Sequence, residues 1–239
     1  MKTGLLSFAT AIIAAPALAS TVSVSSFSKS AYDSSVASMG RTVTQDFESF
    51  GEHNIVDGFA TNVGKFSTVG GEGTGATVTD ADFDNDGSML ALRDSNVFGR
   101  VSTTRELTGN LYYGNFLDSN DTLGIVWNVV LGAERMFDRL AFTVTDAAEF
   151  GNSMEITTPF GSTVISSAGG GLQRLVEIDF GQAVSSATIT LSHFKGNNQR
   201  TNDGFSIDDI AVGEVPLPAS ALLLIAGLAG LAAMRRRKA

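Results

Sequence analysis

The chain contains the segment Val184-Ser-Ser-Ala-Thr-Ile-Thr-Leu-Ser-His-Phe194, in which apolar and hydroxyl-bearing side chains alternate. Ala187, Ile189 and Leu191 fall on one face, and the threonines and serine between them fall on the other. Successive side chains of a β-strand point to opposite faces of a sheet, so the pattern predicts a strand with one buried and one solvated face. This period of two recurs along most of the chain, whereas the 3.6-residue period of an amphipathic helix is nearly absent.

The rest of the chain indicates many more short strands, separated by clusters of Gly, Asn, Asp and Ser that are typical of turns. We expect these strands at residues 42–50, 65–69, 76–79, 89–92, 97–103, 123–131, 139–145, 154–157, 163–166, 172–180 and 205–212. Only residues 105–111 and 147–150 look briefly helical. Many strands without long helices predict an all-β fold, a two-sheet antiparallel sandwich of jelly-roll-like form. Residues 41–214 would form the sandwich, and the Ser- and Ala-rich residues 20–40 would be a flexible leader or an edge strand.

The N-terminal end has the pattern of a secretory signal peptide. Lys2 supplies a positive charge, residues 5–15 are apolar, and Ala17-Leu18-Ala19 forms an A-x-A cleavage site before Ser20. We therefore expect residues 1–19 to be removed and the protein to be exported.

The C-terminal end predicts a membrane anchor. Residues 219–234 form an apolar run that is about as short as a membrane-spanning helix can be. Four cations follow at residues 235–238, and such a cluster resists translocation, so the C-terminus should stay in the cytoplasm and the sandwich should lie outside. A short proline motif precedes the run and consists of Val215, Pro216, Leu217, Pro218 and Ala219.

Motif, apolar run and Arg cluster together resemble the PEP-CTERM class of bacterial sorting signals in its VPLPA variant, over residues 215–239. The resemblance implies an inner-membrane-anchored precursor that an exosortase cuts near the proline motif. The product would remain at the cell surface or in the extracellular matrix, where relatives are commonly linked to extracellular polysaccharide. The alternative is a plain single-span anchor that is never cut.

Charge and composition narrow the range of partners. Between residues 20 and 214 the chain carries 11 Lys and Arg against 25 Asp and Glu, a formal charge of −14. Such a surface repels nucleic acid and anionic lipid but attracts cations. The chain has no cysteine, so an exported domain has to be stabilised by its core or by metal ions rather than by disulfides.

An acidic loop at residues 80–87 is the strongest candidate for a metal site. Asp82, Asp84, Asp86 and Gly87 fit the D-x-D-x-D-G core of a calcium-binding loop, in which alternate carboxylates converge on one hard cation. The twelfth position from Asp82 is Arg93 rather than a bidentate Glu, so the loop is not an EF-hand. The alternative is an acidic, solvated hairpin turn.

A second acidic group is divided between the two ends of the sandwich. Asp46 and Glu48 lie in the first firm strand, and Asp208 and Asp209 lie in the last, within residues 205–210. These segments resemble the terminal strands of jelly-roll modules of secreted bacterial proteins, including many carbohydrate-binding modules. The resemblance implies that the terminal strands pair and that the four carboxylates hold a structural calcium ion. The alternative is an apolar core strand in which the two adjacent Asp residues mark a bulge.

Aromatic side chains beside polar ones could stack on a sugar ring. The candidates are Tyr112, Tyr113, Phe116, Trp127 and the polar run 193–200. Trp127 stands in an apolar segment, where burial is the more natural expectation, so the two tyrosines are the better candidates.

Catalytic chemistry has little support in the sequence. His53 and His193 stand in no triad or metalloprotease motif, and we expect both to be loop or surface residues. We therefore expect a non-catalytic exported protein of the surface or matrix. The rival interpretations are a carbohydrate-binding adhesion module and, less favoured, a secreted polysaccharide hydrolase, for which 25 acidic residues leave any catalytic pair undefined.

Overall fold

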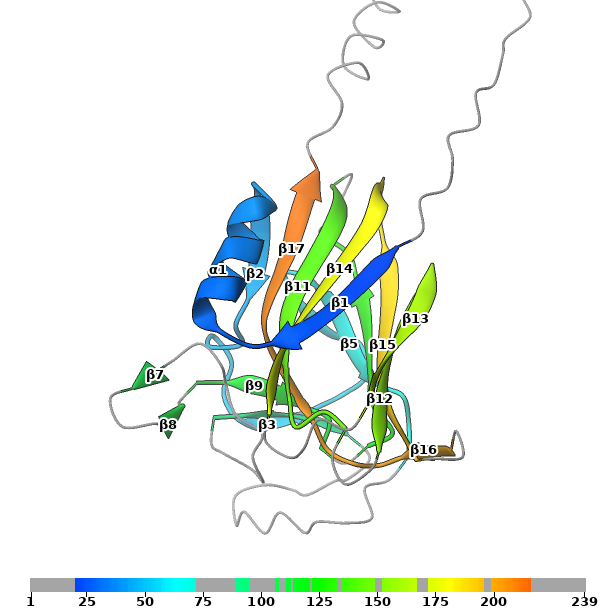
Figure 1. Cartoon of the computed structure of the whole chain (residues 1–239). Helices are drawn as coiled ribbons and strands as arrows, with labels where there is room; N and C mark the ends of the chain where they lie inside the picture. The colour runs from blue at the N-terminus through cyan, green and yellow to red at the C-terminus, as the bar shows by residue number, and fades with distance from the viewer. Residues whose placement is uncertain are drawn as a thin grey trace, which may run out of the picture.

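The computed structural model describes residues 20–71, 89–94, 106–107, 111–112, 114–120, 122–132, 135–148, 152–166, 172–195 and 199–215. Over these residues the chain forms two antiparallel β-sheets packed together, with one short helix on the outside (Figure 1). The predicted all-β sandwich of two antiparallel sheets is confirmed.

The larger sheet has eight strands, and the long strands lie in its middle. In spatial order they are β1 (Thr21–Ser26), β14 (Gln173–Val184), β11 (Met136–Thr145), β17 (Ser206–Val215), β9 (Phe116–Asp118), β6 (Leu90–Arg93) and β3 (His53–Ile55), with β2 (Thr42–Gln45) also paired to β17.

The smaller sheet has seven strands and faces the larger one across the core. In order they are β13 (Gly161–Ser166), β12 (Ser153–Thr158), β15 (Ala187–Lys195), β10 (Ile125–Val129), β5 (Gly64–Thr68) and β4 (Phe59–Thr61), with β16 (Gln199–Thr201) paired to β15. A separate two-stranded ribbon joins β7 (Glu106–Leu107) to β8 (Leu111–Tyr112), where a brief helix was expected.

The core lies between the sheets, around Trp127. Its indole ring stacks on Phe66 at 5.7 Å and meets Phe142 edge-on at 5.9 Å. The indole Nε1 donates a hydrogen bond of 3.1 Å to the carbonyl of Val63, which satisfies the polar group of a fully buried ring. The alternation of residues 184–194 is present in β15, where Ile189 and Leu191 are buried in this core.

The N-terminal segment forms an edge strand followed by a helix. β1 pairs with β14, and α1 (Lys29–Ser38) then crosses the outer face of the larger sheet (Figure 1). The edge strand was one of two expectations for this segment, whereas the helix was not expected. Ser28 caps the helix by accepting a bond from the Ala31 amide, and Lys29 pairs with Asp33 one turn later.

Most predicted strands are present with shifted ends. The expected strand at residues 42–50 stops at Gln45, and the one at 172–180 continues to Val184. The expected strands at 76–79 and 97–103 lie outside the described residues. The short strands β3, β4, β9 and β16 were not expected, because three-residue strands contain too few positions to show alternation.

The strands expected at residues 42–50 and 205–212 lie side by side, as predicted. β2 pairs with β17 in the register Val43 to Val212. The alternative interpretation of β17 is also correct, because its register against β11 shifts between Ala141 and Thr143. Asp209 and Ile210 together stand opposite Phe142, and Asp209 has a φ of 49°, so the bulge begins directly after Asp208.

The beginning of β1 and the end of β17 lie at the same end of the larger sheet (Figure 1). One row of paired residues crosses five strands there, joining Thr21, Asp179, Arg139, Gly213 and Thr42 in that order. The segments before β1 and after β17 therefore both start from this end of the sandwich.

Candidate functional site

The acidic loop of Asp82, Asp84 and Asp86 lies outside the described residues, but Arg93 at its twelfth position does not. Arg93 is the last residue of β6 and is buried. Its Nε lies 2.6 Å from Asp118 Oδ2, and its Nη2 donates to Asn120 Oδ1 at 2.7 Å. Arg93 is thus part of an internal polar network, which agrees with the conclusion that the loop is no EF-hand.

The paired terminal strands do not direct all four carboxylates to one point. Asp46 Oδ1 accepts a bond from the Glu48 amide at 3.2 Å, which closes a local turn. Glu48 instead reaches toward β9, where its Oε1 accepts from the Asn115 amide at 3.1 Å. Asp208 Oδ1 accepts from the Asp209 amide at 2.7 Å within the bulge.

The pKa of the Tyr32 hydroxyl in α1 reflects the negative charge around the bulge. Burial is the main factor that raises the pKa of its hydroxyl well above the ordinary value, and the negative charge of Asp209 is the next. Asp208, Asp33 and Asp46 act in the same direction. Helix α1 thus places a phenol close to the carboxylates of the terminal strands, where the neutral form of the phenol is favoured.

Among the described residues, no group of three or more His, Cys, Asp or Glu side chains is placed to hold a metal ion. Asp46, Glu48, Asp208 and Asp209 therefore form no such group by themselves. A calcium ion at the terminal strands would therefore need oxygen ligands other than a cluster of these carboxylates.

His193 is a buried core residue, so the expectation of a surface or loop histidine is wrong for it. Its Nδ1 lies 2.8 Å from the carbonyl of Asp203, and its Nε2 accepts from the Ala148 amide at 3.1 Å. The ring joins β15 to two loops, which is a structural role. His53, by contrast, is exposed in β3.

The aromatic candidates for sugar stacking differ in whether they are buried and in whether their side chains are described. Trp127 and Phe116 are buried, so neither ring can stack on a ligand. Only the backbone of Tyr112 is described, in β8, and Tyr113 lies outside the described residues. Within the polar run, Arg200 lies over the Phe194 ring at 5.9 Å, so this ring already has a cationic partner.

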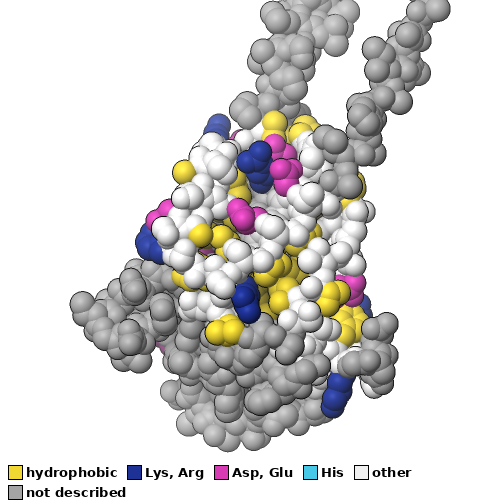
Figure 2. Space-filling model, viewed as in Figure 1, with side chains coloured by type: hydrophobic (Ala, Val, Ile, Leu, Met, Phe, Trp, Pro, Cys, Tyr) yellow, Lys and Arg dark blue, Asp and Glu magenta, His cyan; other side chains and the backbone are white. Residues whose placement is uncertain are grey.

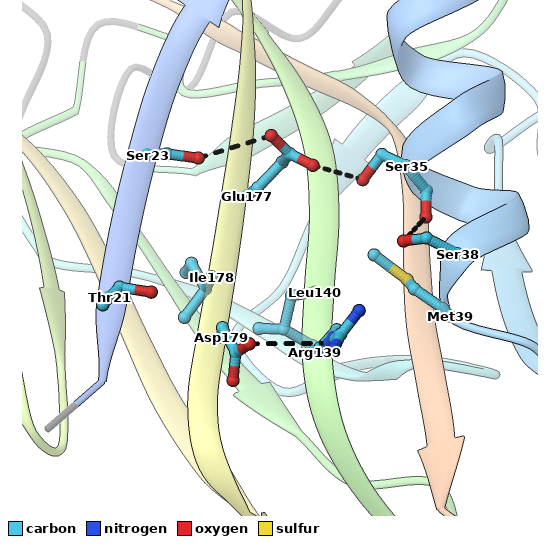
Figure 3. A pocket seen from close by; sticks show the side chains of 10 residues that line it. All are labelled: Thr21, Ser23, Ser35, Ser38, Met39, Arg139, Leu140, Glu177, Ile178 and Asp179. Carbon is cyan, nitrogen blue, oxygen red and sulfur yellow. Dashed lines mark hydrogen bonds and ion pairs between the residues drawn. The ribbon is translucent and has the colours of Figure 1, made fainter. Parts of the chain in front are cut away.

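A cavity of about 240 Å³ opens on the outer face of the larger sheet, between α1 and β1 and above β11 and β14 (Figure 3). It lies next to the row of residues at the end of the sheet from which both terminal segments start. Figure 2 shows basic and acidic side chains gathered on this part of the face. The cavity is lined by Thr21, Ser23, Ser35, Ser38, Met39, Arg139, Leu140, Glu177, Ile178 and Asp179.

Glu177 of β14, on the floor of the cavity, hydrogen-bonds to both of its walls, which are α1 and β1. Its Oε1 accepts a 2.5 Å hydrogen bond from Ser35 of α1, and its Oε2 accepts one of 3.3 Å from Ser23 of β1 (Figure 3). In sequence, residues 27–28 connect the edge strand to the helix. Glu177 therefore links α1 and β1 through one carboxylate.

Arg139 and Asp179 lie at the end of the cavity nearest the termini. Arg139 Nε is 3.5 Å from Asp179 Oδ2, and the two side chains are 43% and 47% exposed. Both side chains therefore keep exposed polar atoms, whereas three wall hydroxyls already donate within the protein, those of Ser23 and Ser35 to Glu177 and that of Ser38 to the Ser35 carbonyl. The lining combines charged and hydroxyl side chains, and none of the lining residues is aromatic.

Sequence reasoning did not find this cavity. Its residues come from four elements, and each is ordinary by itself. The capping serine and the Lys29 to Asp33 spacing were the local signals that could have revealed α1, and with it one wall.

No protein-family model matches this chain, and no curated protein matches it. Within the described residues, no helix is long and apolar enough to cross a membrane.

Proposed function

We propose that this chain is a non-catalytic exported protein that its C-terminal segment holds at the inner membrane. An exosortase-type enzyme would process it there. The product would remain at the cell surface or in the extracellular matrix, in association with extracellular polysaccharide. The observation that carries the proposal is the position of the sorting motif. Val215 is both the last residue of β17 and the first residue of the motif. A cut within the motif would leave every described strand intact.

The end of β17 is firmly held, as a junction between a folded domain and an anchor should be. Val215 pairs with Met136 of β11, and Gly213 pairs with Thr42 of β2. Between them, Glu214 Oε2 lies 3.0 Å from Arg41 Nε and 3.6 Å from Arg135 Nη1. Pulling on the anchor would load the centre of a sheet rather than a free edge.

The arrangement of the ends supports export and anchoring together. Thr21 and Gly213 lie in one row at one end of the sheet, so the signal-peptide cleavage site and the sorting motif would face the same membrane. Ser20, the expected first residue after cleavage, directly precedes β1 and contacts Thr158 across the sandwich at 3.2 Å. Export processing would thus end where the fold begins.

We further infer a jelly-roll-like topology, since the chain crosses repeatedly between the sheets and its terminal strands β2 and β17 are neighbours. Calcium remains part of the proposal through Asp82, Asp84 and Asp86, whose spacing suits that ion.

Mass spectrometry of the protein from its native host tests the proposal. We expect the mature form to begin at Ser20 and to end within or just after the motif, and Pro218→Ala to leave an uncut, membrane-retained form. Leu172→Ala, at an exposed position far from the motif in sequence, is the control and should be cut normally. A surface protein that still ends at Ala239 would reduce the tail to a simple anchor.

A second candidate function is the binding of a terminal sugar unit in the cavity. It is favoured by the four hydroxyl side chains and the accessible Arg139 and Asp179 that line the cavity. Electrophoresis through gels that contain the host polysaccharide would measure it as retardation. Asp179→Asn should weaken the retardation, whereas Asp33→Asn, which removes the same charge outside the cavity, should not. Equal retardation of the two variants would exclude the cavity as the binding site.

A further inference from the structure

The edge strands of the sandwich differ in how well they are protected. An edge strand presents unpaired backbone N–H and C=O groups, and proteins usually shield such edges by shortness, charge, proline or bulges. Among the described strands, β2, β3, β4 and β16 have only three or four residues each. β1 and β13 have six each and are the two long edges.

β13 lacks every one of these protective features. Its sequence, Gly-Ser-Thr-Val-Ile-Ser over Gly161–Ser166, contains no charge and no proline. It pairs with β12 from Ser153–Ser166 to Thr158–Gly161 without a register shift, so no bulge bends it away. Within the described residues, no strand pairs with its other side.

β13 also exposes an apolar side chain, which β1 does not. Val164 is 55% exposed in the middle of the strand, and Phe160 is 40% exposed in the turn before it. In β1, Val22 and Val24 pack against the core, and the side chains of Ser23 and Ser26 bond to Glu177 and Arg174. Of the two long edges, β13 is therefore the one suited to a partner.

The charge of the domain limits what that partner can be. Residues 20–214 carry a formal charge of −14, so two copies repel each other over most of their surfaces. β13 is an uncharged strip, and the same strip on a second copy is equally uncharged. Glu155 is opposite Val164 but lies on β12, which is one strand away from the edge. The Glu155 side chains of two paired copies would therefore stay separated by both β13 strands.

The strand is self-complementary when it is paired antiparallel about its own centre. Opposite residues of an antiparallel pair share a face of the sheet, so a two-fold axis through Val164 sets Val164 against its own copy. Ser162 then faces Ser166 of the second copy, and Thr163 faces its Ile165. Ile165 packs into the core, whereas Val164 would gain an apolar cover that the monomer does not provide.

We propose that two copies of this chain pair through β13, antiparallel across a two-fold axis at Val164, so that the smaller sheet of one copy continues into that of the other. The pairing does not depend on export or on sorting. Because antiparallel pairing reverses the strand direction, the ends with Thr21 and Gly213 of the two copies would point in opposite directions, so the pairing joins released or detergent-solubilised copies rather than two copies anchored in one membrane.

Disulfide cross-linking tests this geometry directly, because the full chain contains no cysteine. Paired residues in antiparallel strands have Cα atoms about 4.5–5.5 Å apart, within the range of a disulfide. The full-length Val164→Cys protein, solubilised in mild detergent and oxidised, should form a covalent dimer. Val56→Cys is the matched control, since Val56 is 66% exposed but lies outside any strand, and it should cross-link at least about tenfold more slowly.

The register gives a second measurement. Ser162→Cys and Ser166→Cys chains should cross-link efficiently when mixed and poorly when either is alone, because each faces the other and not itself. Adding Thr163→Lys to Val164→Cys should suppress the cross-link, while circular dichroism shows that the fold is retained. If Val164→Cys reacts no faster than Val56→Cys, or if mixing has no effect, β13 does not pair with itself in this way and the proposal is wrong.

Discussion

Arg93 Nε lies 2.6 Å from Asp118 Oδ2, and both side chains are almost completely buried in the larger sheet. The pair sits on adjacent strands, since Arg93 of β6 is opposite Phe116 and Asp118 ends the same strand, β9. Asn120 extends the network by accepting from Arg93 and by donating to the carbonyl of Met89 at 3.1 Å. Met89 and Arg93, which follow the acidic residues in sequence, therefore both belong to a buried polar network.

Removing one partner of this network should be costly. Asp118→Ala leaves a buried guanidinium without its carboxylate, and we expect the free energy of unfolding to fall by about 3–5 kcal/mol. Denaturant unfolding measures the loss. The exposed pair Lys29 and Asp33 is the control, and Asp33→Ala should cost no more than about 0.5 kcal/mol. Similar losses for the two variants would mean that Arg93 finds another partner.

Tyr32 should make the protein sensitive to alkali. Its pKa is raised in the folded state, so folding favours the protonated phenol. The resulting stability is fully present below the unfolded pKa of about 10 and is lost as pH rises above it. Because Lys and Arg side chains also titrate there, the quantity to measure is the difference between wild type and Tyr32→Phe. Wild type should lose more stability than Tyr32→Phe between about pH 8 and about pH 11, and parallel losses would contradict the prediction.

Calcium should stabilise the fold if Asp82, Asp84 and Asp86 bind it. Without the ion these carboxylates repel each other, and a filled site stabilises the folded state by about 2.7 kcal/mol at a hundredfold excess over the dissociation constant. The melting temperature should rise with calcium and fall with chelator, Asp84→Ala should remove most of the response, and magnesium should give a smaller one. A melting temperature that is the same with calcium and with chelator would exclude the site.

Gly64 should tolerate no side chain. Its φ is 128°, and a Cβ atom there would lie 2.1 Å from the backbone oxygen of Asn128 on β10. Gly58 is the matched control, because its φ of 83° is also positive but no atom lies within 4 Å of the added Cβ. We expect Gly58→Ala to cost about 1–2 kcal/mol from backbone strain alone and Gly64→Ala to cost clearly more in thermal unfolding. Equal costs would show that β5 and β10 can move apart.

Strands could be predicted from the sequence where alternation continued for several residues. β15 and the apolar residues of β17 follow a local rule, since side-chain direction in a strand depends only on position along it. The same rule could not find β3 or β9, which have three residues each and are stabilised by neighbours rather than by their own pattern. Helix α1 was missed because its many serines resemble a linker, although its N-cap was visible.

The candidate sites also differ in how far they could be predicted from the sequence. The bulge at Asp208 and Asp209 could be anticipated, because two adjacent polar residues interrupt an alternating strand. That Glu48 contacts Asn115 rather than the other carboxylates could not, because the direction of a side chain after a strand ends depends on the turn it enters. The burial of His193 was missed because its partners, Asp203 and Ala148, lie in loops outside its own strand, and Ala148 is 45 residues away in the chain.

The sequence by itself determined the two-sheet β-sandwich class of this protein, because that class follows from the period of hydrophobicity and from turn residues, which act locally. The tertiary structure alone decided which strands became neighbours, which of the described strands lie at a sheet edge and which polar residues were buried. Thr21, Arg139 and Gly213 meet in one row only because β1, β11 and β17 are brought together across more than a hundred residues of chain. Such pairings depend on the summed packing of the whole core, which no short stretch of sequence contains.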